Sequence, residues 1–376
     1  KEINEKELKS RLSKNNKTTS NKGTSNNMEK RYSKKFKEKD IVNQLRKKNP
    51  FLIRDYLIDN NIEIFRDLDN FYILEINKKN SYVTKKSNAK DFVFAEVKTN
   101  LENFLNTNDV FKTIDYFINL FVEDYFMQLI RSDMLIHGIT IDVENPDNRL
   151  IYRKRKNYLN LFFGYDVLYN KNHDYKNSYI RKLILGMCGG NLLVEKIINY
   201  FDAVCIFSNL KVSKAIVMIS EEHGVGKDTK HKVMEAILGT FTTKVELKEL
   251  TGNFNSYISQ KKLVVVSELK VEDKKTLAEL KSHISEEKIR INEKFVKSYL
   301  ADNLAFFYLY SNYKDALVLE ETDRRYIVID CTAPQDYFGD DFFNNFSKTE
   351  AIEEQAQIYF SHLKDLVDTI GIEEMY

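Results

Sequence analysis

The segment 215–238 constrains the fold of this chain more than any other part of the sequence. An apolar run, Ala215–Ile219, leads into a turn that ends in Gly224-Val225-Gly226-Lys227, and a helical pattern follows. Backbone N–H groups of such a turn and of the helix N-terminus converge on phosphate oxygens, and the lysine ammonium reaches the same anion. The segment therefore predicts a strand, a phosphate-binding turn and a helix.

Two positions of this turn depart from the usual phosphate-binding motif. Glu221 stands where the first glycine is usual. Asp228 directly follows Lys227, so the hydroxyl that usually holds Mg²⁺ comes one place later, at Thr229. Taken alone, the segment fits both a degenerate phosphate-binding loop and a chance Gly-Lys turn.

Further apolar runs alternate with helical patterns after residue 211. They cover Leu263–Val266, Leu304–Tyr310 and Tyr326–Ile329. The spacing between Lys227 and Glu268 leaves room for one helix and one more strand. This alternation predicts an α/β sandwich with a mainly parallel sheet.

Polar residues flank three of these runs. Glu268 follows Ser267 at the end of one run, where an acid orients water and shapes the Mg²⁺ shell in P-loop ATPases. Asn312 ends another run, where an amide can hydrogen-bond both a γ-phosphate and the attacking water. Arg324-Arg325 precede a third run, and the guanidinium fork suits developing phosphoryl charge. Each has a structural alternative: a surface acid, a strand terminator and a pair of salt bridges.

Taken together, these elements resemble the superfamily 3 helicases, especially the helicase half of phage and plasmid primase-helicases and primase-polymerases. Two further segments carry the resemblance. Lys281–Lys297 is similar to the family's pore hairpin, and Tyr158–Tyr165 is similar to the Asn-aromatic-Gly segment that often precedes these ATPase domains. The resemblance covers about residues 155–332.

The resemblance implies an AAA+-like P-loop ATPase that binds ATP and Mg²⁺, forms a hexameric ring and moves along single-stranded DNA in phage or plasmid replication. It implies Glu268 as the catalytic acid, Asn312 as the sensor, and Arg324 or Arg325 as the arginine finger that acts on a neighbour. The implied nucleotide-binding residues are Gly224, Val225, Gly226, Lys227, Asp228 and Thr229, of which Thr229 or Asp228 holds Mg²⁺. The implied DNA-binding residues are Lys294, Arg290 and Lys297.

Composition and patterning divide the chain into five segments. Residues 1–40 are rich in Lys, Asn, Ser and Thr, and a segment with so few apolar residues is predicted to be a flexible basic linker. The other four are a small α/β module at 41–90 with strands at 70–76 and 81–84, a helical domain at 91–205, the P-loop ATPase domain at 206–335, and a helical tail at 336–376. For the helical domain, the family resemblance implies a role in oligomerisation.

Other features limit the partners. The net charge is only +2, so bulk charge does not indicate a nucleic-acid partner. We find no apolar run of about eighteen residues, so we expect no membrane partner and a cytoplasmic location, in the host cell if the protein is viral. The three cysteines are far apart and fit reduced thiols rather than zinc ligands. Asp67-Leu68-Asp69 has the carboxylate spacing of a metal site but no His partner, and Arg153–Lys156 fits a solvated basic face better than a phosphate grip.

Three alternatives to a helicase remain open. One is an ATPase that does not unwind DNA, such as an initiator or a nucleotide-gated clamp. Another is a ring-forming scaffold with a decayed phosphate loop, which Glu221 and Ser267 favour. A P-loop kinase-like enzyme is the third, and the paired arginines argue against it. Because the chain begins with Lys1 rather than Met, we expect a fragment of a longer protein. The resemblance implies that a primase or polymerase domain precedes it in the full-length protein.

Overall fold

The computed structural model describes strands at residues 62–66, 71–76 and 81–86, and residues 137–375 except 138, 149, 154, 163, 253, 272, 294–295, 317–322 and 345–351. The predicted linker at 1–40 and the Asp67-Leu68-Asp69 motif lie outside the described residues. None of the helices in the described part is long and apolar enough to cross a membrane.

Three antiparallel strands form a small sheet in the N-terminal part of the chain. They are β1 (Ile62–Arg66), β2 (Phe71–Ile76) and β3 (Ser81–Lys86), in the order β1-β2-β3. The strands expected at 70–76 and 81–84 are observed as β2 and β3, and β1 is an additional strand.

A second three-stranded sheet lies within the segment that was expected to be helical, 91–205. Its strands are β4 (Ile139–Thr140), β5 (Leu150–Arg153) and β6 (Lys156–Asn160), in the order β4-β6-β5. The strands have only two to five residues, too few for a period-2 pattern to stand out from the surrounding sequence. Two helices follow, as expected: α7 (Tyr179–Met187) and α8 (Leu192–Phe207).

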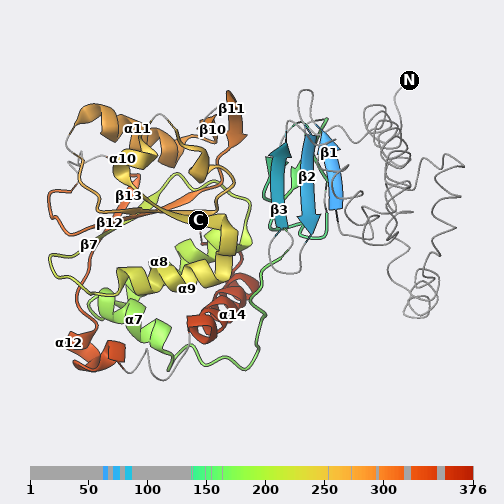
Figure 1. Ribbon diagram of the computed structural model, residues 1–376. Helices are drawn as coiled ribbons and strands as arrows, with labels where there is room; N and C mark the ends of the chain where they lie inside the picture. The colour runs from blue at the N-terminus through green and yellow to red at the C-terminus, as the bar shows by residue number, and fades with distance from the viewer. Residues whose placement is uncertain are drawn as a thin grey trace, which may run out of the picture. The chain divides into compact units, whose positions relative to one another are not determined.

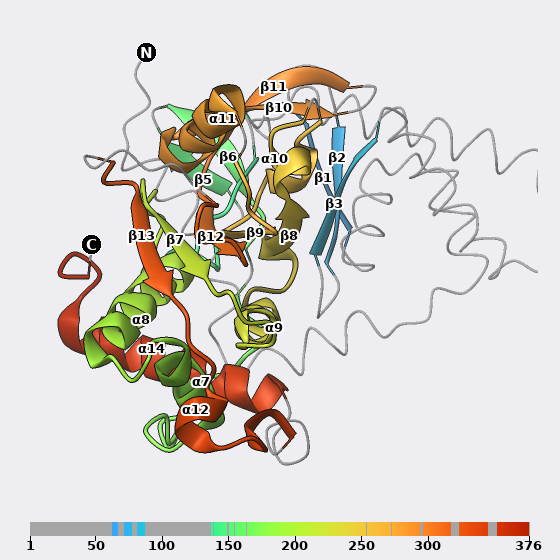
Figure 2. The same cartoon turned by 90° about the vertical axis from the view of Figure 1, so that its left-hand side faces the viewer.

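Five parallel strands form the central sheet, which confirms the expected mainly parallel arrangement. The strand order is β13-β7-β12-β9-β8, as Figure 2 shows. Their bounds are β7 Ala215–Ile219, β8 Thr242–Glu246, β9 Leu263–Ser267, β12 Phe306–Ser311 and β13 Tyr326–Asp330. β8 is the additional strand that the spacing allowed. Because all five run the same way, their carboxyl ends share one edge of the sheet.

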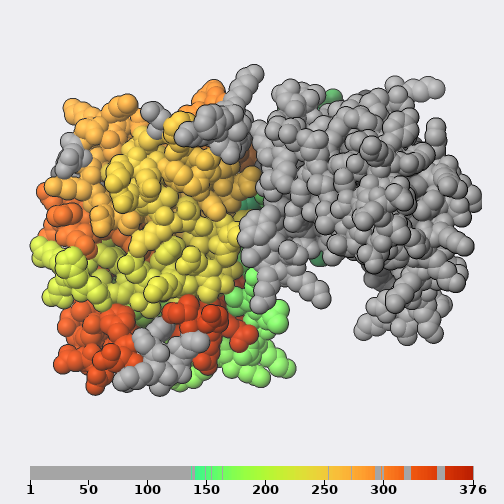
Figure 3. Space-filling model, in the orientation of Figure 1, coloured from blue at the N-terminus to red at the C-terminus, as the bar shows by residue number. Residues whose placement is uncertain are grey.

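Helices cover both faces of this sheet (Figure 1). One layer holds α7, α8, α9 (Lys227–Leu238) and α14 (Ile352–Ile370). The other holds α10 (Leu247–Leu250), α11 (Lys274–Ser285) and the antiparallel hairpin of β10 (Lys288–Glu293) and β11 (Val296–Asp302). Short helical turns complete the described elements: η1 Gly239–Phe241, η2 Ser256–Ile258 and α12 Gln335–Phe338. In the space-filling view, the coloured left-hand part has the orange α11 segment at its upper edge and the red C-terminal residues at its lower edge (Figure 3).

The alternation of side chains along each strand explains the two layers. On β7, Ile216 and Met218 pack into the α9 layer, whereas Ala215 and Val217 pack into the α11 layer. Strands buried on both faces read as continuous apolar runs, which is why the sequence indicated them. The α9-side core also contains buried residues of α7, α8 and α14, so it spans parts of the predicted helical domain, ATPase domain and tail.

Candidate nucleotide site

The turn after β7 has the backbone that a phosphate loop needs. Gly226 has φ 96°, and a Cβ added there would lie 2.4 Å from Cδ1 of Leu183, so only glycine fits. Gly224 also has a positive φ, 79°, but faces open space. Glu221 is not among the described residues with positive φ, so its position does not require glycine. Its exposed carboxylate pairs with Lys314 at 2.9 Å.

The helix that follows this turn differs from its neighbours at its N-terminus. Side chains of Ser178, Asn191 and Asp273 cap α7, α8 and α11 by accepting bonds from first-turn amides. No described side chain caps α9, whose N-cap is Gly226. First-turn amides without a cap carry partial positive charge and favour an anion.

Lys227 is the first residue of α9, and the structure brings it to Asn312. Its Nζ donates to Oγ of Ser220 at 2.8 Å, to the carbonyl of Ser311 at 2.7 Å and to Oδ1 of Asn312 at 2.9 Å. Burial lowers the pKa of this half-buried lysine. The loop and the tip of β12 are joined further by Ser220, whose N–H donates to the carbonyl of Ser311 at 3.1 Å.

The two candidate Mg²⁺ residues differ in their surroundings. Asp228 is exposed and accepts a hydrogen bond from Nζ of Lys244, on β8, at 2.6 Å. Thr229 is partly buried in the first turn of α9. Val225 is buried in the α9-side core and so anchors the turn to that core.

Glu268 follows β9 in a strained conformation. Its φ is 52°, which is unusual for a residue with a side chain and costs on the order of 1 kcal/mol or more. The backbone is held there because the N–H of Leu269 donates to the carbonyl of Tyr310 at 2.8 Å, and Oγ of Ser311 donates to the carbonyl of Leu269 at 2.7 Å. These bonds tie the tips of β9 and β12 together.

An open cavity of about 360 Å³ lies beside the carboxylate of Glu268. Its lining includes Lys248, Lys270 and Asp273. Ser267, which stands where a first acid is usual, donates its Oγ to the carbonyl of Val245 at 3.3 Å. The end of β9 therefore presents one carboxylate rather than two.

The two arginines lie at the opposite end of the sheet. They precede β13, and the carbonyl of Arg325 accepts from the N–H of Ala215, the first residue of β7. At about 3.3 Å per residue, the five residues of β7 separate this end from the nucleotide loop by roughly 16 Å. Neither arginine therefore shares a site with Lys227 of the same chain.

Arg324 and Arg325 also differ from each other. Arg325 donates from Nη1 to Asp323 at 3.1 Å and from Nε to Oγ of Ser285 at 2.8 Å, and Lys281 pairs with the same buried aspartate at 2.8 Å. This is the structural salt bridge that the sequence left open. Arg324 is exposed and forms no ion pair within the described part of the chain.

The predicted DNA-binding residues belong to the β10–β11 hairpin. Arg290 is exposed on β10, and its Nη1 donates to Oγ of Ser298 at 3.3 Å. Lys297 lies on β11, and Lys294 lies outside the described residues. The sequence did not reveal Asn255, whose side chain and backbone make three hydrogen bonds of 2.8 to 3.1 Å to Arg290 and Asn292 of β10. A single asparagine in a loop gives no periodic signal, so only the structure identifies this clamp.

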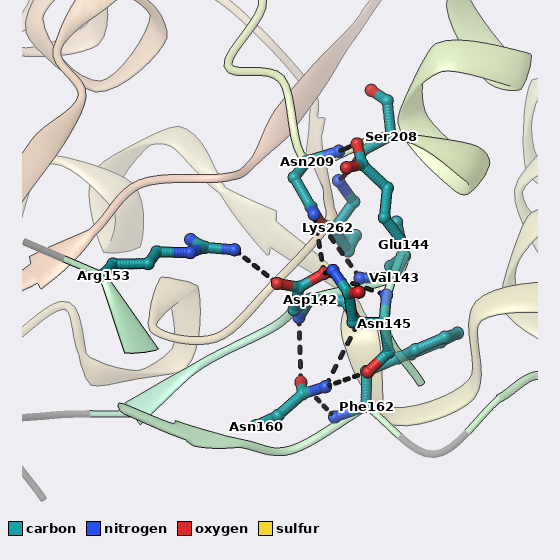
Figure 4. Close-up of polar contacts among 10 residues, drawn as sticks. All are labelled: Asp142, Val143, Glu144, Asn145, Arg153, Asn160, Phe162, Ser208, Asn209 and Lys262. Atoms are coloured by element: carbon teal, nitrogen blue, oxygen red, sulfur yellow. Dashed lines mark hydrogen bonds and ion pairs between the residues drawn. The ribbon is translucent and has the colours of Figure 1, made fainter. Parts of the chain in front are cut away.

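The Asn-aromatic-Gly segment forms a structural clamp (Figure 4). The fully buried amide of Asn160 donates to the carbonyls of Asp142 and Asn145, and accepts from the N–H groups of Asp142 and Phe162. Burial alone would raise the pKa of Asp142, but hydrogen bonds from Asn209, Asn145 and Arg153 lower it. Arg153 therefore pairs with a buried acid, whereas Arg155 and Lys156 are exposed, as in the solvated basic face that the sequence favoured.

In the described part of the chain, no group of three or more His, Cys, Asp or Glu side chains is arranged to hold a metal ion. Cys188, Cys205 and Cys331 are free and buried.

Comparison with known proteins gives a fold and no activity. A family model described as a family of unknown function (DUF5906) matches residues 218–325. No curated protein matches the chain. Two solved structures of the NrS-1 C-terminal region are similar to this chain. The A form apo structure has a TM-score of 0.61 and 18% sequence identity, and the match covers 84% of this chain and 69% of that one. Another apo structure has a TM-score of 0.59 and 17% sequence identity, and the match covers 83% of this chain and 69% of that one.

Proposed function

We propose that this chain is an ATP-dependent DNA helicase or translocase of the superfamily 3 type, with an AAA+-like core, that acts in phage or plasmid DNA replication. The observation that carries the proposal is the uncapped start of α9, where Lys227 contacts Asn312 beside a turn that only glycine fits. An uncapped helix N-terminus next to a lysine and a strand-tip amide suits a nucleotide triphosphate.

The residues take roles that follow from their surroundings. Lys227 exchanges its oxygen acceptors for the phosphates of ATP, and Asn312 and Glu268 position and polarise the attacking water. Thr229 is the better candidate to hold a Mg²⁺ ion, because Lys244 already engages Asp228. When bound, the ion would neutralise phosphate charge.

The position of the arginines supports an oligomer. Because Arg324 and Arg325 lie roughly 16 Å from the nucleotide loop of their own chain, an arginine finger must come from a neighbouring copy. Arg324 is the better candidate, since it is exposed and Arg325 is held by Asp323 and Ser285. We propose a hexameric ring in which the β10–β11 hairpin, with Arg290, Lys294 and Lys297, contacts single-stranded DNA.

The similar structures support the proposed context. Both structures are of a C-terminal region, and this chain covers 69% of each. We propose that a primase or polymerase domain precedes this chain in the full-length protein and that the protein acts in the cytoplasm of the host.

Steady-state ATP hydrolysis with and without single-stranded DNA tests the proposal. We expect DNA to stimulate ATP hydrolysis by the wild-type chain. Lys227→Ala should lower the rate of hydrolysis by about 10²-fold or more, because a charge that stabilises the transition state is lost. Lys232→Ala is the matched control, since Lys232 is exposed on the same helix. Equal turnover by the wild type and Lys227→Ala would contradict the proposal.

That outcome would favour a ring-forming DNA-binding scaffold or clamp for an attached polymerase. One observation supports this second function: Ser267 leaves a single carboxylate at the end of β9. The scaffold predicts oligomers that bind DNA without turnover.

A further inference from the structure

A buried carboxylate, Asp202 on α8, joins three other elements of the core. It is completely buried. Its Oδ2 accepts from Nζ of Lys230 at 2.7 Å and from the hydroxyl of Tyr359 at 2.7 Å, and its Oδ1 accepts from the hydroxyl of Tyr308 at 2.8 Å. Burying a carboxylate is costly unless it is paired and hydrogen-bonded, so these donors fix the positions of their elements relative to α8.

Two of the three donors stand on the elements that carry the candidate nucleotide site. Lys230 lies one turn after Lys227 on α9, and its N–H donates to the carbonyl of Gly226 at 2.9 Å. Tyr308 lies four residues before Asn312 on β12, and the ammonium of Lys230 lies 4.1 Å from the centre of its ring. Burial and the charge of Asp202 raise the pKa of Tyr308 well above its usual value, so its hydroxyl stays a donor.

α9 and β12 are therefore bridged twice. One bridge lies at the strand tip, where Lys227 donates to Ser311 and Asn312. The other passes through Asp202, which holds Lys230 and Tyr308 within the core. Lys227 is only half-buried, so its ammonium can exchange its acceptors at the strand tip for other oxygen atoms. The Asp202 bridge is completely buried and is closed to water.

We infer that Asp202 is a positioning residue for the nucleotide site: through Lys230 and Tyr308 it keeps α9 and β12 in fixed register when phosphates draw Lys227 away from the tip of β12. The inference rests on the proposed function, since it assigns Lys227 a phosphate ligand. Tyr359 reaches the same carboxylate from α14, which carries none of the candidate site residues, and so provides a matched comparison.

The experiment compares Tyr308→Phe with Tyr359→Phe in the full chain. Each substitution removes one hydroxyl from the same carboxylate and keeps the ring. Amide hydrogen exchange is followed in peptides that cover 218–231, 306–313 and 352–370, and kcat and KM for ATP are measured in parallel. We expect Tyr308→Phe to speed exchange of the first two peptides about tenfold and to lower kcat about tenfold, with KM within about twofold, since small misplacements reduce turnover more than binding.

Tyr359→Phe should speed exchange only in the α14 peptide and leave kcat within about twofold of the wild type. Equal exchange patterns in the two variants would make the hydroxyls interchangeable core contacts and would overturn the inference, even if the chain did not hydrolyse ATP. An unchanged kcat of Tyr308→Phe in an active chain would overturn it as well. Failure of the proposed function is a separate result, namely equal turnover by the wild type and Lys227→Ala.

Discussion

The two ends of the central sheet both gather basic side chains, but their surroundings differ. At the carboxyl end, half-buried Lys227 donates to Ser220, Ser311 and Asn312 beside an uncapped helix. At the amino end, Lys262 is fully buried and donates to the carbonyl of Ser208, so its acceptor is fixed. Residue type alone therefore does not mark a site. Access to solvent and the ability to exchange acceptors do.

The amino end also presents an exposed arginine. Arg324 is open to solvent, and it lies too far from the Lys227 site of the same chain to act there. In the ring proposed above, the site at the carboxyl end of one copy would receive its missing positive charge from the amino end of a neighbouring copy. Three predictions test this comparison, beginning with the largest effect.

Arg324→Ala should lower kcat for ATP about 10³-fold, because an arginine finger stabilises transition-state charge. Arg325→Ala should leave kcat within a few fold, because Asp323 and Ser285 hold that guanidinium. Mixing Arg324→Ala with Lys227→Ala subunits should restore part of the turnover, since some interfaces then combine an intact loop with an intact finger. If Arg325→Ala loses as much activity as Arg324→Ala, or if mixing restores nothing, the contrast between the two ends is wrong.

Gly226→Ala should destabilise the chain by about 2–3 kcal/mol, because the new Cβ would meet Leu183 and the backbone has φ 96°. Gly224→Ala is the control: it shares the positive φ but faces open space, so about 1 kcal/mol is expected. Denaturant unfolding measures both free energies. Equal costs would mean that the close contact at the carboxyl end is relieved by movement of Leu183.

The sequence predicted the strands and the parallel sheet because buried parallel strands read as uninterrupted apolar runs. It did not predict the order β13-β7-β12-β9-β8, since apolar runs carry no information about which strand is the neighbour. The Asp202 and Asn160 networks were also missed. A buried Asp on a helix and a buried Asn at the end of a strand look like surface residues in a sequence, and only their partners reveal their burial.

The candidate site was predicted in its residue types but not in its geometry. The ends of the apolar runs made Lys227, Glu268 and Asn312 candidates, because polar residues at the carboxyl ends of parallel strands share an edge, and the family resemblance implied their roles. The sequence offered no physical reason to choose between Arg324 and Arg325, and their different surroundings now provide one. Their place at the far end of the sheet follows from strand direction, which the sequence indicated only in general terms.

Lys211 provides the most local test of the amino end. Its Nζ donates to the carbonyl of Ala305 at 2.7 Å and lies 5.1 Å from the ring centre of Phe307. Burial, helped by the charge of Lys262, lowers the pKa of Lys211 from its usual 10.5 to about 7. Between these two pH values the unfolded chain binds more protons than the folded chain, so the free energy of unfolding rises with pH. The stability that Lys211 contributes at high pH is lost as the pH falls toward 7.

We therefore expect the wild-type chain to be more stable at about pH 9.5 than at about pH 7, by about 3 kcal/mol from this group. Lys211→Met should remove this part of the slope while keeping the apolar stem against Phe307. Lys232→Met, at an exposed position, should retain the slope. Urea unfolding at the two pH values measures the difference between each variant and the wild type. An unchanged slope in Lys211→Met would mean that this ammonium is solvated, and the amino end would then resemble the exchangeable carboxyl end instead of contrasting with it.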